Sequence, residues 1–167
     1  VVLAPAESTR EAAVQRMHRA EQRRQALAST RSLPPVTVDG FRVTLLCNAS
    51  GPDEVAAGLA AGAEGVGLLR TELAFLDAPA WPDEDAHLLA LTDALALLDD
   101  RVATVRTLDF GADKTPPFLA GVEQRGLALM LAHEDALAAQ LRAILRAGAA
   151  TRLRILFPLV ESREQLR

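Results

Sequence analysis

Residues 65–72 read GVGLLRTE, and residues 102–109 read VATVRTLD. Each stretch is a short apolar run, typical of a buried strand, that ends in Arg-Thr and is followed by an acid. A parallel α/β sheet carries its ligand chemistry at the carboxyl ends of its strands. If both strands belong to one such sheet, two guanidinium groups reach the same rim, and together they predict an anion site.

Composition sets the broad class of the protein. The chain has 167 residues, half of them hydrophobic, and a net charge of -4, which suits one core or part of a larger one. This charge balance does not indicate a nucleic-acid partner or an anionic membrane. No apolar run approaches roughly 18 residues, so we expect no membrane insertion. Cys47 is alone, which excludes an internal disulfide and suits a reducing cytoplasm. We interpret it as a small buried residue rather than a nucleophile.

The first 35 residues predict an interdomain linker. Ser8 and Glu11 fit a capping box, and a helix is expected from Thr9 to about Ala28. This helix has few large apolar residues, so we interpret it as solvated rather than buried. Residues 31–35, RSLPP, break it and force extended backbone.

Residues 36–167 predict alternating strands and helices. Asp39-Gly40 between apolar residues predicts a hairpin, whose second strand is expected to continue to Asn48. Residues 50–54 open a helix that runs to about 61, and residues 82–85 open another. Further strands are predicted at 65–69, 102–105 and 153–157. The helix before residue 102 is expected to turn five leucines toward the core: Leu88, Leu89, Leu91, Leu95 and Leu98. A last helix is predicted at 134–147, with Leu137, Leu141, Ile144 and Leu145 on one side.

This alternation is typical of a parallel sheet with crossover helices. Four such units predict an α/β fold, the first half of a (β/α)8 barrel. Ser162 and Gln165 fit another capping box at the start of a further helix. A half barrel has two unpaired edges and an uncovered inner face. We therefore expect residues 1–167 alone to need a partner chain or to be marginally stable.

Arg70 and Arg106 are the candidate anion ligands. Arginine is always charged, and its planar fork meets two carboxylate or phosphate oxygens at once. The alternative is that each arginine only pairs with Glu72 or Asp109 and fastens a strand end. Two such motifs at equivalent strand ends favour the anion site, with the acids holding the forks in place.

The other polar candidates carry less information. Residues 111–114 predict a turn that brings one more cation, Lys114. Trp81, between prolines, is interpreted as a packed loop residue, and the acids at 83–85 as the first turn of a helix. Three histidines lack metal-ligand spacing and are expected to be solvated or to cap helices: His18, His87 and His133.

Several stretches resemble one known family. Residues 62–72, GAEGVGLLRTE, with Phe75-Leu-Asp77 behind them, and residues 105–114, VRTLDFGADK, resemble two signatures of Enzyme I. Enzyme I is the phosphoenolpyruvate-protein phosphotransferase of the bacterial sugar phosphotransferase system. Residues 140–147 and 153–158 match as well. The resemblance implies the first half of that enzyme's phosphoenolpyruvate-binding barrel, preceded by the interdomain helix.

The resemblance also implies roles for individual residues. Arg70 and Arg106 match arginines that grip the phosphate and carboxylate of phosphoenolpyruvate, and Arg125 matches a third that reaches the phosphate. We expect four further side chains to support this site: Asn48, Glu72, Asp109 and Lys114. No catalytic residue or metal ligand is expected within this chain.

In the family, the phosphoryl group passes to a histidine on a separate domain and then to the phosphocarrier HPr for sugar uptake. The acceptor histidine, the active-site cysteine and the acids that bind Mg²⁺ are expected outside residues 1–167, so His18 and Cys47 do not take these roles. The resemblance further implies a cytoplasmic homodimer. Residues 1–167 alone are expected to be inactive.

Two alternatives stay open. The first is an enzyme of the pyruvate phosphate dikinase or phosphoenolpyruvate synthase type, which shares the barrel and an Arg-Thr-Glu. The run VRTLD followed by G-x-D-K favours Enzyme I or a multiphosphoryl fusion containing it. The second is a degenerate, non-catalytic barrel. Its support comes from departures from the family pattern: Ala112 in place of a second glycine, a shortened 114–125 loop without Asn-Pro-x-Leu-Gly, and Ala128 in place of an arginine.

Overall fold

The computed structural model describes residues 4, 6–28, 30, 33–111 and 114–167. The chain divides into two compact units, Val1–Val43 and Thr44–Arg167. The sequence separates the linker from the barrel after Pro35, and that assignment of functional domains remains a prediction.

The first unit contains one long helix, α1 (Glu7–Ala28), with no buried residue. This confirms the expected solvated helix. It begins before Ser8, so the predicted capping box of Ser8 with Glu11 is wrong. The amide N–H of Thr9 bonds to the carbonyl of Ala6 at 2.9 Å instead, because a helix that starts earlier places Ser8 within its first turn.

The predicted hairpin is present as a single antiparallel bridge between Val36 and Arg42. The expected continuous strand from there to Asn48 is wrong. Residues 43–46 form no strand, and β1 is only Cys47–Ala49. The reason lies in the backbone hydrogen bonds: the carbonyl of Leu45 accepts from the amide of Glu64 at 2.7 Å, outside any strand ladder.

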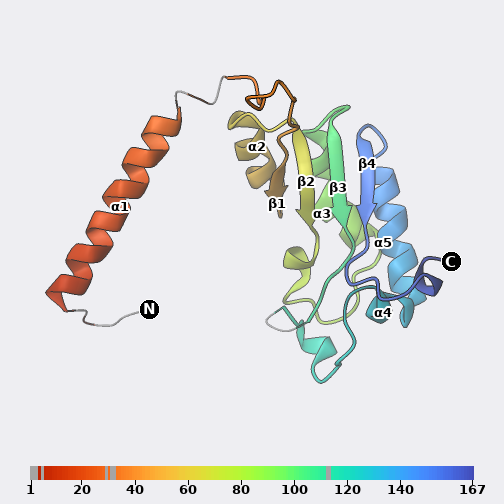
Figure 1. Ribbon diagram of the computed structural model, residues 1–167. Helices are drawn as coiled ribbons and strands as arrows, with labels where there is room; N and C mark the ends of the chain where they lie inside the picture. Colours follow the sequence, from red (N-terminus) through yellow and green to blue (C-terminus); the bar gives the residue numbers. More distant parts are fainter. Residues whose placement is uncertain (1–3, 5, 29, 31–32, 112–113) are drawn as a thin grey trace. The chain divides into compact units, whose positions relative to one another are not determined.

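The second unit contains a four-stranded parallel sheet in the order β1-β2-β3-β4 (Figure 1). Its other strands are β2 (Gly65–Arg70), β3 (Val102–Arg106) and β4 (Arg152–Leu156). The α/β class and the parallel order are confirmed, and the arrangement is that of part of a β/α barrel. All four arrowheads point to the same end, where the segments that follow β2 and β3 gather (Figure 1).

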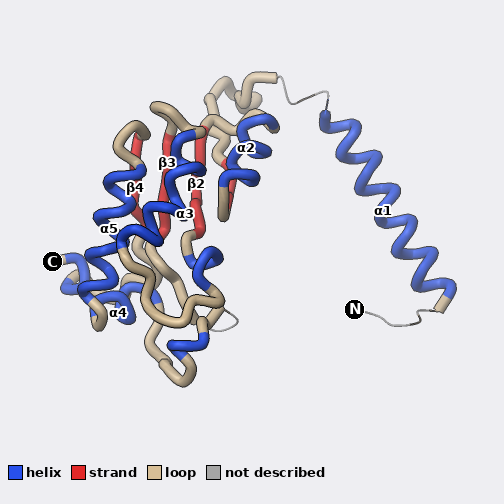
Figure 2. The backbone as a smooth tube through the Cα atoms, turned by 180° about the vertical axis from the view of Figure 1, so that it is seen from behind, coloured by secondary structure: helices blue, strands red, loops and turns tan. Residues whose placement is uncertain are grey.

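Three helices cover one face of the sheet (Figure 2). They are α2 (Pro52–Ala60), α3 (Glu84–Ala96) and α5 (Glu134–Ala147). The core between helices and strands is formed chiefly by Ala49, Val55, Val66, Leu69, Leu91, Ala94, Leu95, Leu98, Ala103, Val105 and Ile144. This burial is the main stabilising contribution of the unit.

Two leucines that the sequence assigns to the core are exposed instead. Leu89 is 81% exposed and Leu145 is 57% exposed. An α-helix turns about 100° per residue, so Leu89 lies far around α3 from Leu91 and Leu95, which are buried. In α5 the buried stripe runs through Ala136, Ala139, Gln140, Ala143 and Ile144.

The start of α3 has a side-chain cap. The carboxylate of Asp83 accepts a hydrogen bond from the amide of Ala86 at 2.8 Å. Glu84 in the next position forms ion pairs with Arg142 and Arg146 of α5 at 2.7 and 2.5 Å. At the far end of the chain, the predicted helix is a short 3₁₀ turn, η3 (Glu164–Leu166).

The segments at the carboxyl ends of β2 and β3 have a small core of their own. They contain η1 (Glu72–Phe75), η2 (Pro117–Leu119) and α4 (Gly126–Leu131), of which α4 has no counterpart in the sequence prediction. The core residues are Leu108, Phe110, Leu119, Leu129, Met130 and Ala136, with Phe75, Trp81, Phe118 and Leu137 packed against them. Trp81 is therefore a packed loop residue, as predicted.

The register of β2 determines which side chains face away from the helices. β2 is irregular between Val66 and Leu69, and both of these residues point into the core. Arg70 follows Leu69 and therefore lies on the other face, as Arg106 does after Val105. Within the described residues of the second unit, no helix covers that face (Figure 1).

None of the described helices has both the length and the apolar character needed to span a bilayer.

Candidate functional site

The site is built on the carboxyl ends of β2 and β3. Arg70 and Arg106 are register partners in adjacent parallel strands. Both are the last residues of their strands. The predicted placement of the two arginines at one rim is therefore confirmed, while their ligand remains to be proposed.

Glu72 is the centre of the charge cluster. Its side chain is fully buried and its Oε1 accepts from Arg106 Nη2 at 2.5 Å. Asp109 Oδ2 lies 3.2 Å from Arg106 Nη1. Both acids thus hold the same arginine, and Glu72 reaches across from the end of β2 to the side chain of β3. This fixes the guanidinium of Arg106, whose side chain is 15% exposed.

Lys114 joins this cluster through a tight turn. Gly111 and Lys114 exchange two backbone hydrogen bonds, at 3.1 and 3.0 Å. The Lys114 ammonium lies 3.0 Å from the same Glu72 oxygen that Arg106 uses. The turn predicted from residues 111–114 therefore delivers its cation to the arginine site.

Arg70 has a different environment from Arg106. Among the described residues it forms no ion pair, and its Nε is buried without a hydrogen-bond partner. Its charge reaches the first turn of α2. There the pKa of Glu54 is lowered, first by a hydrogen bond from the Ser50 hydroxyl, then by the Ser50 amide, and to a smaller extent by Arg70.

Unpartnered polar atoms concentrate at these two strand ends. Seven buried side-chain nitrogen and oxygen atoms lack a partner within the described part of the chain, and two of them belong to His87. The other five belong to residues at or just after the ends of β2 and β3: Arg70 Nε, Glu72 Oε2, Arg106 Nε, Thr107 Oγ1 and Asp109 Oδ1. Buried polar groups are normally hydrogen-bonded. A cluster of exceptions is typical of a site that a ligand completes.

The charges of the cluster favour an anion. Glu72 and Asp109 form ion pairs with Arg106 and Lys114, whereas the charge of Arg70 has no ion-pair partner within the described residues. Arg106 carries five N–H donors, and the two carboxylates engage only part of them. Its remaining donors and those of Arg70 can therefore bind oxygen atoms of a small polyanion.

The structure places Arg125 close to the cluster. Arg125 is the exposed N-cap residue of α4. Its side chain lies against the backbone of Gly111, where any β-carbon would collide with it, and Gly111 has a positive φ of 139°. Contact with the phosphate remains a prediction for Arg125. Ala128 lies within α4, and Ala112 is outside the described residues.

Asn48 is the middle residue of β1 and is exposed. Its neighbours Cys47 and Ala49 pack with the core, so Asn48 lies on the face of the sheet that carries the arginines. The described residues provide no hydrogen-bond partner for its side chain. A supporting role at the site stays a prediction.

Cys47 and His87 lie apart from this chemistry. The Cys47 thiol donates to the carbonyl of Gly65 at 3.5 Å, and burial raises its pKa, which agrees with a packing role. The expectation of a solvated or capping His87 is wrong. His87 is 1% exposed and packs edge-on against Phe75. Burial lowers its pKa from 6.5 to about 4, against a weaker opposing effect of Asp83.

Two important residues were missed by the sequence analysis. Gln140 is fully buried in α5 and bonds to both strand ends. Thr71 is also buried and links Gln140 to the carbonyl of Arg106. A signal for Gln140 exists in the sequence, because it is an amide in the middle of a buried stripe at helical spacing.

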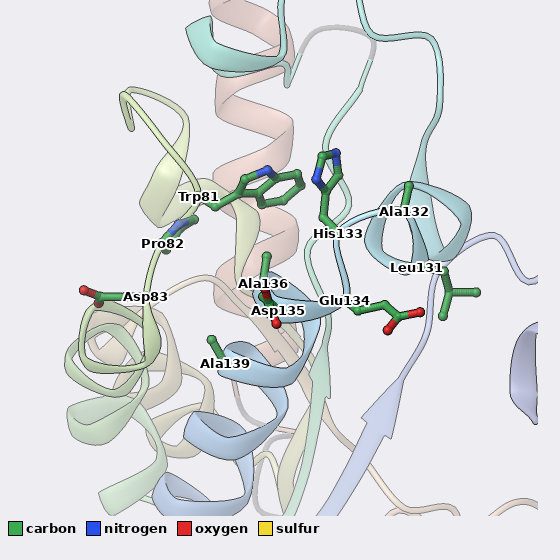
Figure 3. Close-up of a pocket in the computed structure, with 10 residues that line it drawn as sticks. All are labelled: Trp81, Pro82, Asp83, Leu131, Ala132, His133, Glu134, Asp135, Ala136 and Ala139. Carbon is green, nitrogen blue, oxygen red and sulfur yellow. The ribbon is translucent and has the colours of Figure 1, made fainter.

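A hollow of about 700 Å³ lies on the outer side of these segments, between the starts of α3 and α5 (Figure 3). Trp81 and His133 form one wall, with ring centres 4.8 Å apart. Asp83 and Glu134 point away from each other (Figure 3). None of the three predicted arginines lines this hollow. We therefore do not assign the anion site to it, although the hollow is large enough for a small ligand.

The residues in the described ranges do not fit a metal site. They contain no group of three or more His, Cys, Asp or Glu side chains arranged to hold a metal ion. Glu72 and Asp109 are instead engaged with Arg106.

Comparison with known proteins agrees with this geometry. The family described as "PEP-utilising enzyme, PEP-binding domain" matches residues 24–167. The match includes all of the residues placed at the site.

Three curated relatives illustrate the similarity. The chain is 42% identical to a multiphosphoryl transfer protein of Rhodobacter capsulatus, over 99% of this chain and 21% of the relative. It is 40% identical to a phosphoenolpyruvate-protein phosphotransferase of Streptomyces coelicolor, over 86% and 28%. It is 37% identical to one of Bacillus sp. (strain S), over 79% and 24%. The chain thus spans only about a fifth to three tenths of the length of such relatives.

Proposed function

Because this chain belongs to the PEP-binding domain family of PEP-utilising enzymes, we propose that its paired arginines bind phosphoenolpyruvate. The observation that carries the proposal is the register pairing of Arg70 with Arg106 at one rim of a parallel sheet. Both arginines keep a buried, unpartnered Nε at this position. The chemistry of the site and the chemistry of the family's substrate therefore agree.

Phosphoenolpyruvate presents a phosphate and a carboxylate on a three-carbon frame. Each group matches the planar fork of one guanidinium. Arg106 is fixed by Glu72 and Asp109 and offers its free N–H groups in a set direction. Arg70 supplies the second fork, and Lys114 adds positive charge nearby. Phosphoryl transfer depends mainly on such positioned charge, because little covalent chemistry is needed from the protein.

For the whole protein we propose a phosphoenolpyruvate-protein phosphotransferase, the activity after which the relatives from Bacillus sp. and Streptomyces coelicolor are named. The phosphoryl group passes to a histidine outside this chain and then to HPr, which serves sugar uptake. The enzyme works as a cytoplasmic homodimer. A multiphosphoryl fusion protein containing the same domain is the closely related form of this proposal.

Magnesium is part of the proposal for the whole enzyme only. The described residues hold no group of three or more His, Cys, Asp or Glu side chains arranged for a metal ion. We propose, as the family resemblance implies, that the magnesium ligands lie outside this chain. Within the chain, the arginines, the lysine and their carboxylates bind and orient the substrate.

Calorimetric titration of phosphoenolpyruvate into the full-length protein tests the proposal. Arg70→Ala and Arg106→Ala each remove one fork, and a hydrogen bond to a charged group contributes about 1.5–3 kcal/mol. We expect each variant to bind at least about tenfold more weakly. Arg142→Ala is the matched control, because Arg142 is an exposed arginine paired with Glu84 on the helix side.

The control variant is expected to bind as the wild type does. If the wild type fails to bind phosphoenolpyruvate, the non-catalytic alternative is correct and the proposal fails. Wild-type affinity in both Arg70→Ala and Arg106→Ala would place the binding site elsewhere.

A further inference from the structure

One buried side chain connects both strand ends of the site. Gln140 of α5 is fully buried. Its Oε1 accepts from the backbone amide of Leu108 at 3.0 Å, just after β3. Its Nε2 donates to Thr71 Oγ1 at 3.1 Å, just after β2. A single amide of the covering helix therefore bonds to the residue that follows Arg70 and to the second residue after Arg106.

Thr71 completes the connection. Its hydroxyl accepts from Gln140 and donates to the carbonyl of Arg106 at 2.9 Å. Thr71 is 5% exposed, so water does not compete for these bonds. The chain of bonds from Gln140 through Thr71 to Arg106 thus ties the end of β2 to the end of β3 outside the ladder of the sheet.

The sheet contains one register irregularity close to this alignment. β2 is irregular between Val66 and Leu69, close to the site. Side chains alternate between the faces of a strand, so a slip of one residue moves Arg70 to the helix side. The ladder between β2 and β3 also ends at the arginines. Hydrogen bonds from outside the ladder therefore add to what fixes one guanidinium against the other, beside the contact of Glu72 with Arg106.

We propose that Gln140 is a positioning residue that aligns Arg70 with Arg106, so that both forks reach the same phosphoenolpyruvate molecule. The inference rests on the proposed function, since it concerns the same site. Gln140 does not touch the substrate, and it acts through Thr71 and the two strand ends. Its benefit exists only while both arginines are present.

This last property gives a test that a merely structural role would not pass. Phosphoenolpyruvate affinity is measured by calorimetry on four forms of the full-length protein: wild type, Arg70→Ala, Gln140→Met and the double variant. Met keeps the length of Gln140 and removes its hydrogen bonds. We expect Gln140→Met to weaken binding by about tenfold, which lies within the range of coupling between residues of one network.

The double variant decides the mechanism. If Gln140 acts by aligning the pair, Gln140→Met weakens binding little further once Arg70 is gone. If the two losses multiply, Gln140 acts independently of Arg70 and the inference is overturned. Wild-type affinity in Gln140→Met also overturns it while leaving the proposed function intact. Failure of the wild type to bind overturns the proposed function and, with it, this inference.

A second pair of variants covers the case in which Gln140→Met does not fold. Thr71→Val keeps the shape of Thr71 and removes both of its hydrogen bonds, whereas Thr71→Ser keeps the hydroxyl. We expect Thr71→Val to bind phosphoenolpyruvate at least about tenfold more weakly, and Thr71→Ser to bind within a small factor of the wild type. Equal affinity of the two variants contradicts the inference.

Discussion

The ends of β2 and β3 carry the same two residues, Arg-Thr, and meet in register, yet their surroundings differ. Arg106 is held by two carboxylates, whereas Arg70 forms no ion pair within the described residues. For the threonines the difference is reversed: the hydroxyl of the threonine after Arg70 has hydrogen-bond partners, and the hydroxyl of the threonine after Arg106 has none in the described structure. Thr71 accepts one hydrogen bond and donates another, while the buried hydroxyl of Thr107 has no partner in the described structure.

This difference shows that a repeated motif need not produce a repeated environment. Glu72 follows Arg70 in sequence, but it lies in η1 and turns to the arginine of the neighbouring strand. One guanidinium is thereby fixed and the other is left with free donors. A site of this kind can hold one end of a ligand rigidly and adjust to the other end.

The largest effect is expected for Arg106→Ala, which sharpens the contrast with Arg70. It leaves the fully buried Glu72 and the partly buried Asp109 with fewer counter-charges. Breaking a buried ion pair in this way costs about 3–5 kcal/mol. Urea unfolding of the full-length protein should show this loss, alongside weaker phosphoenolpyruvate binding. The exposed pair of Arg142 with Glu84 is the control, and Arg142→Ala should cost less than about 1 kcal/mol. Equal losses of unfolding free energy in Arg106→Ala and Arg142→Ala would contradict the stronger, buried ion pairing of Arg106 with Glu72 and Asp109.

Arg70→Ala should separate binding from stability. Because Arg70 has no carboxylate partner among the described residues, its loss is expected to lower the free energy of unfolding by less than about 1 kcal/mol. Phosphoenolpyruvate affinity should fall by about 10- to 100-fold, since a charged hydrogen-bonding group is removed. Unfolding and calorimetric measurements on the same sample check this. A strongly destabilised Arg70→Ala protein would show that the two arginines are equivalent after all.

The segment after β2 is also expected to respond to pH through His87, which packs against Phe75 of η1. Its pKa is about 4 in the folded protein and 6.5 when unfolded. Between these values the unfolded state binds more protons, so stability falls as pH falls. From pH 7 to pH 5 the loss is about 2 kcal/mol. Urea unfolding of wild type and His87→Phe at both pH values tests this, and parallel losses in the two proteins would exclude His87 as the cause.

Thr71 and Thr107 give the most closely matched pair of variants, with small expected effects on stability. Thr71→Val leaves the amide of Gln140 without a partner and should lower the free energy of unfolding by about 1–2 kcal/mol. Thr107→Val replaces a buried, unpartnered hydroxyl by a methyl group and should be nearly neutral or slightly stabilising. Thermal melting of both variants decides the point. A loss as large in Thr107→Val as in Thr71→Val would mean that the two hydroxyls are held alike.

Much of the fold is predictable from local sequence. The apolar runs at β2 and β3, the Asp83 cap and the boundaries of α5 all follow from patterns within a few residues. The errors arise where distant contacts override the local pattern. β1 is shorter than predicted because the backbone before it bonds to Glu64. Leu89 is an error of another kind, because helical periodicity alone places it away from the buried Leu91 and Leu95.

The sequence predicts the two arginines of the site but not the long-range contacts that hold them. Strand ends with Arg-Thr place Arg70 and Arg106 correctly, because parallel strands share a rim. The sequence does not reveal that Glu72 pairs with the arginine of the other strand. Nor does it reveal that Gln140 bonds across 32 and 69 residues of sequence separation. Such contacts depend on tertiary packing and not on spacing.

The most direct test of the account is a crystal structure of the full-length protein with phosphoenolpyruvate bound. We expect the guanidinium groups of Arg70 and Arg106 to lie within hydrogen-bond distance, about 3 Å, of oxygen atoms on the same ligand molecule, with Glu72 still holding Arg106. A ligand that contacts only one of the two arginines, or neither, would contradict the claim that the paired strand ends form one anion site.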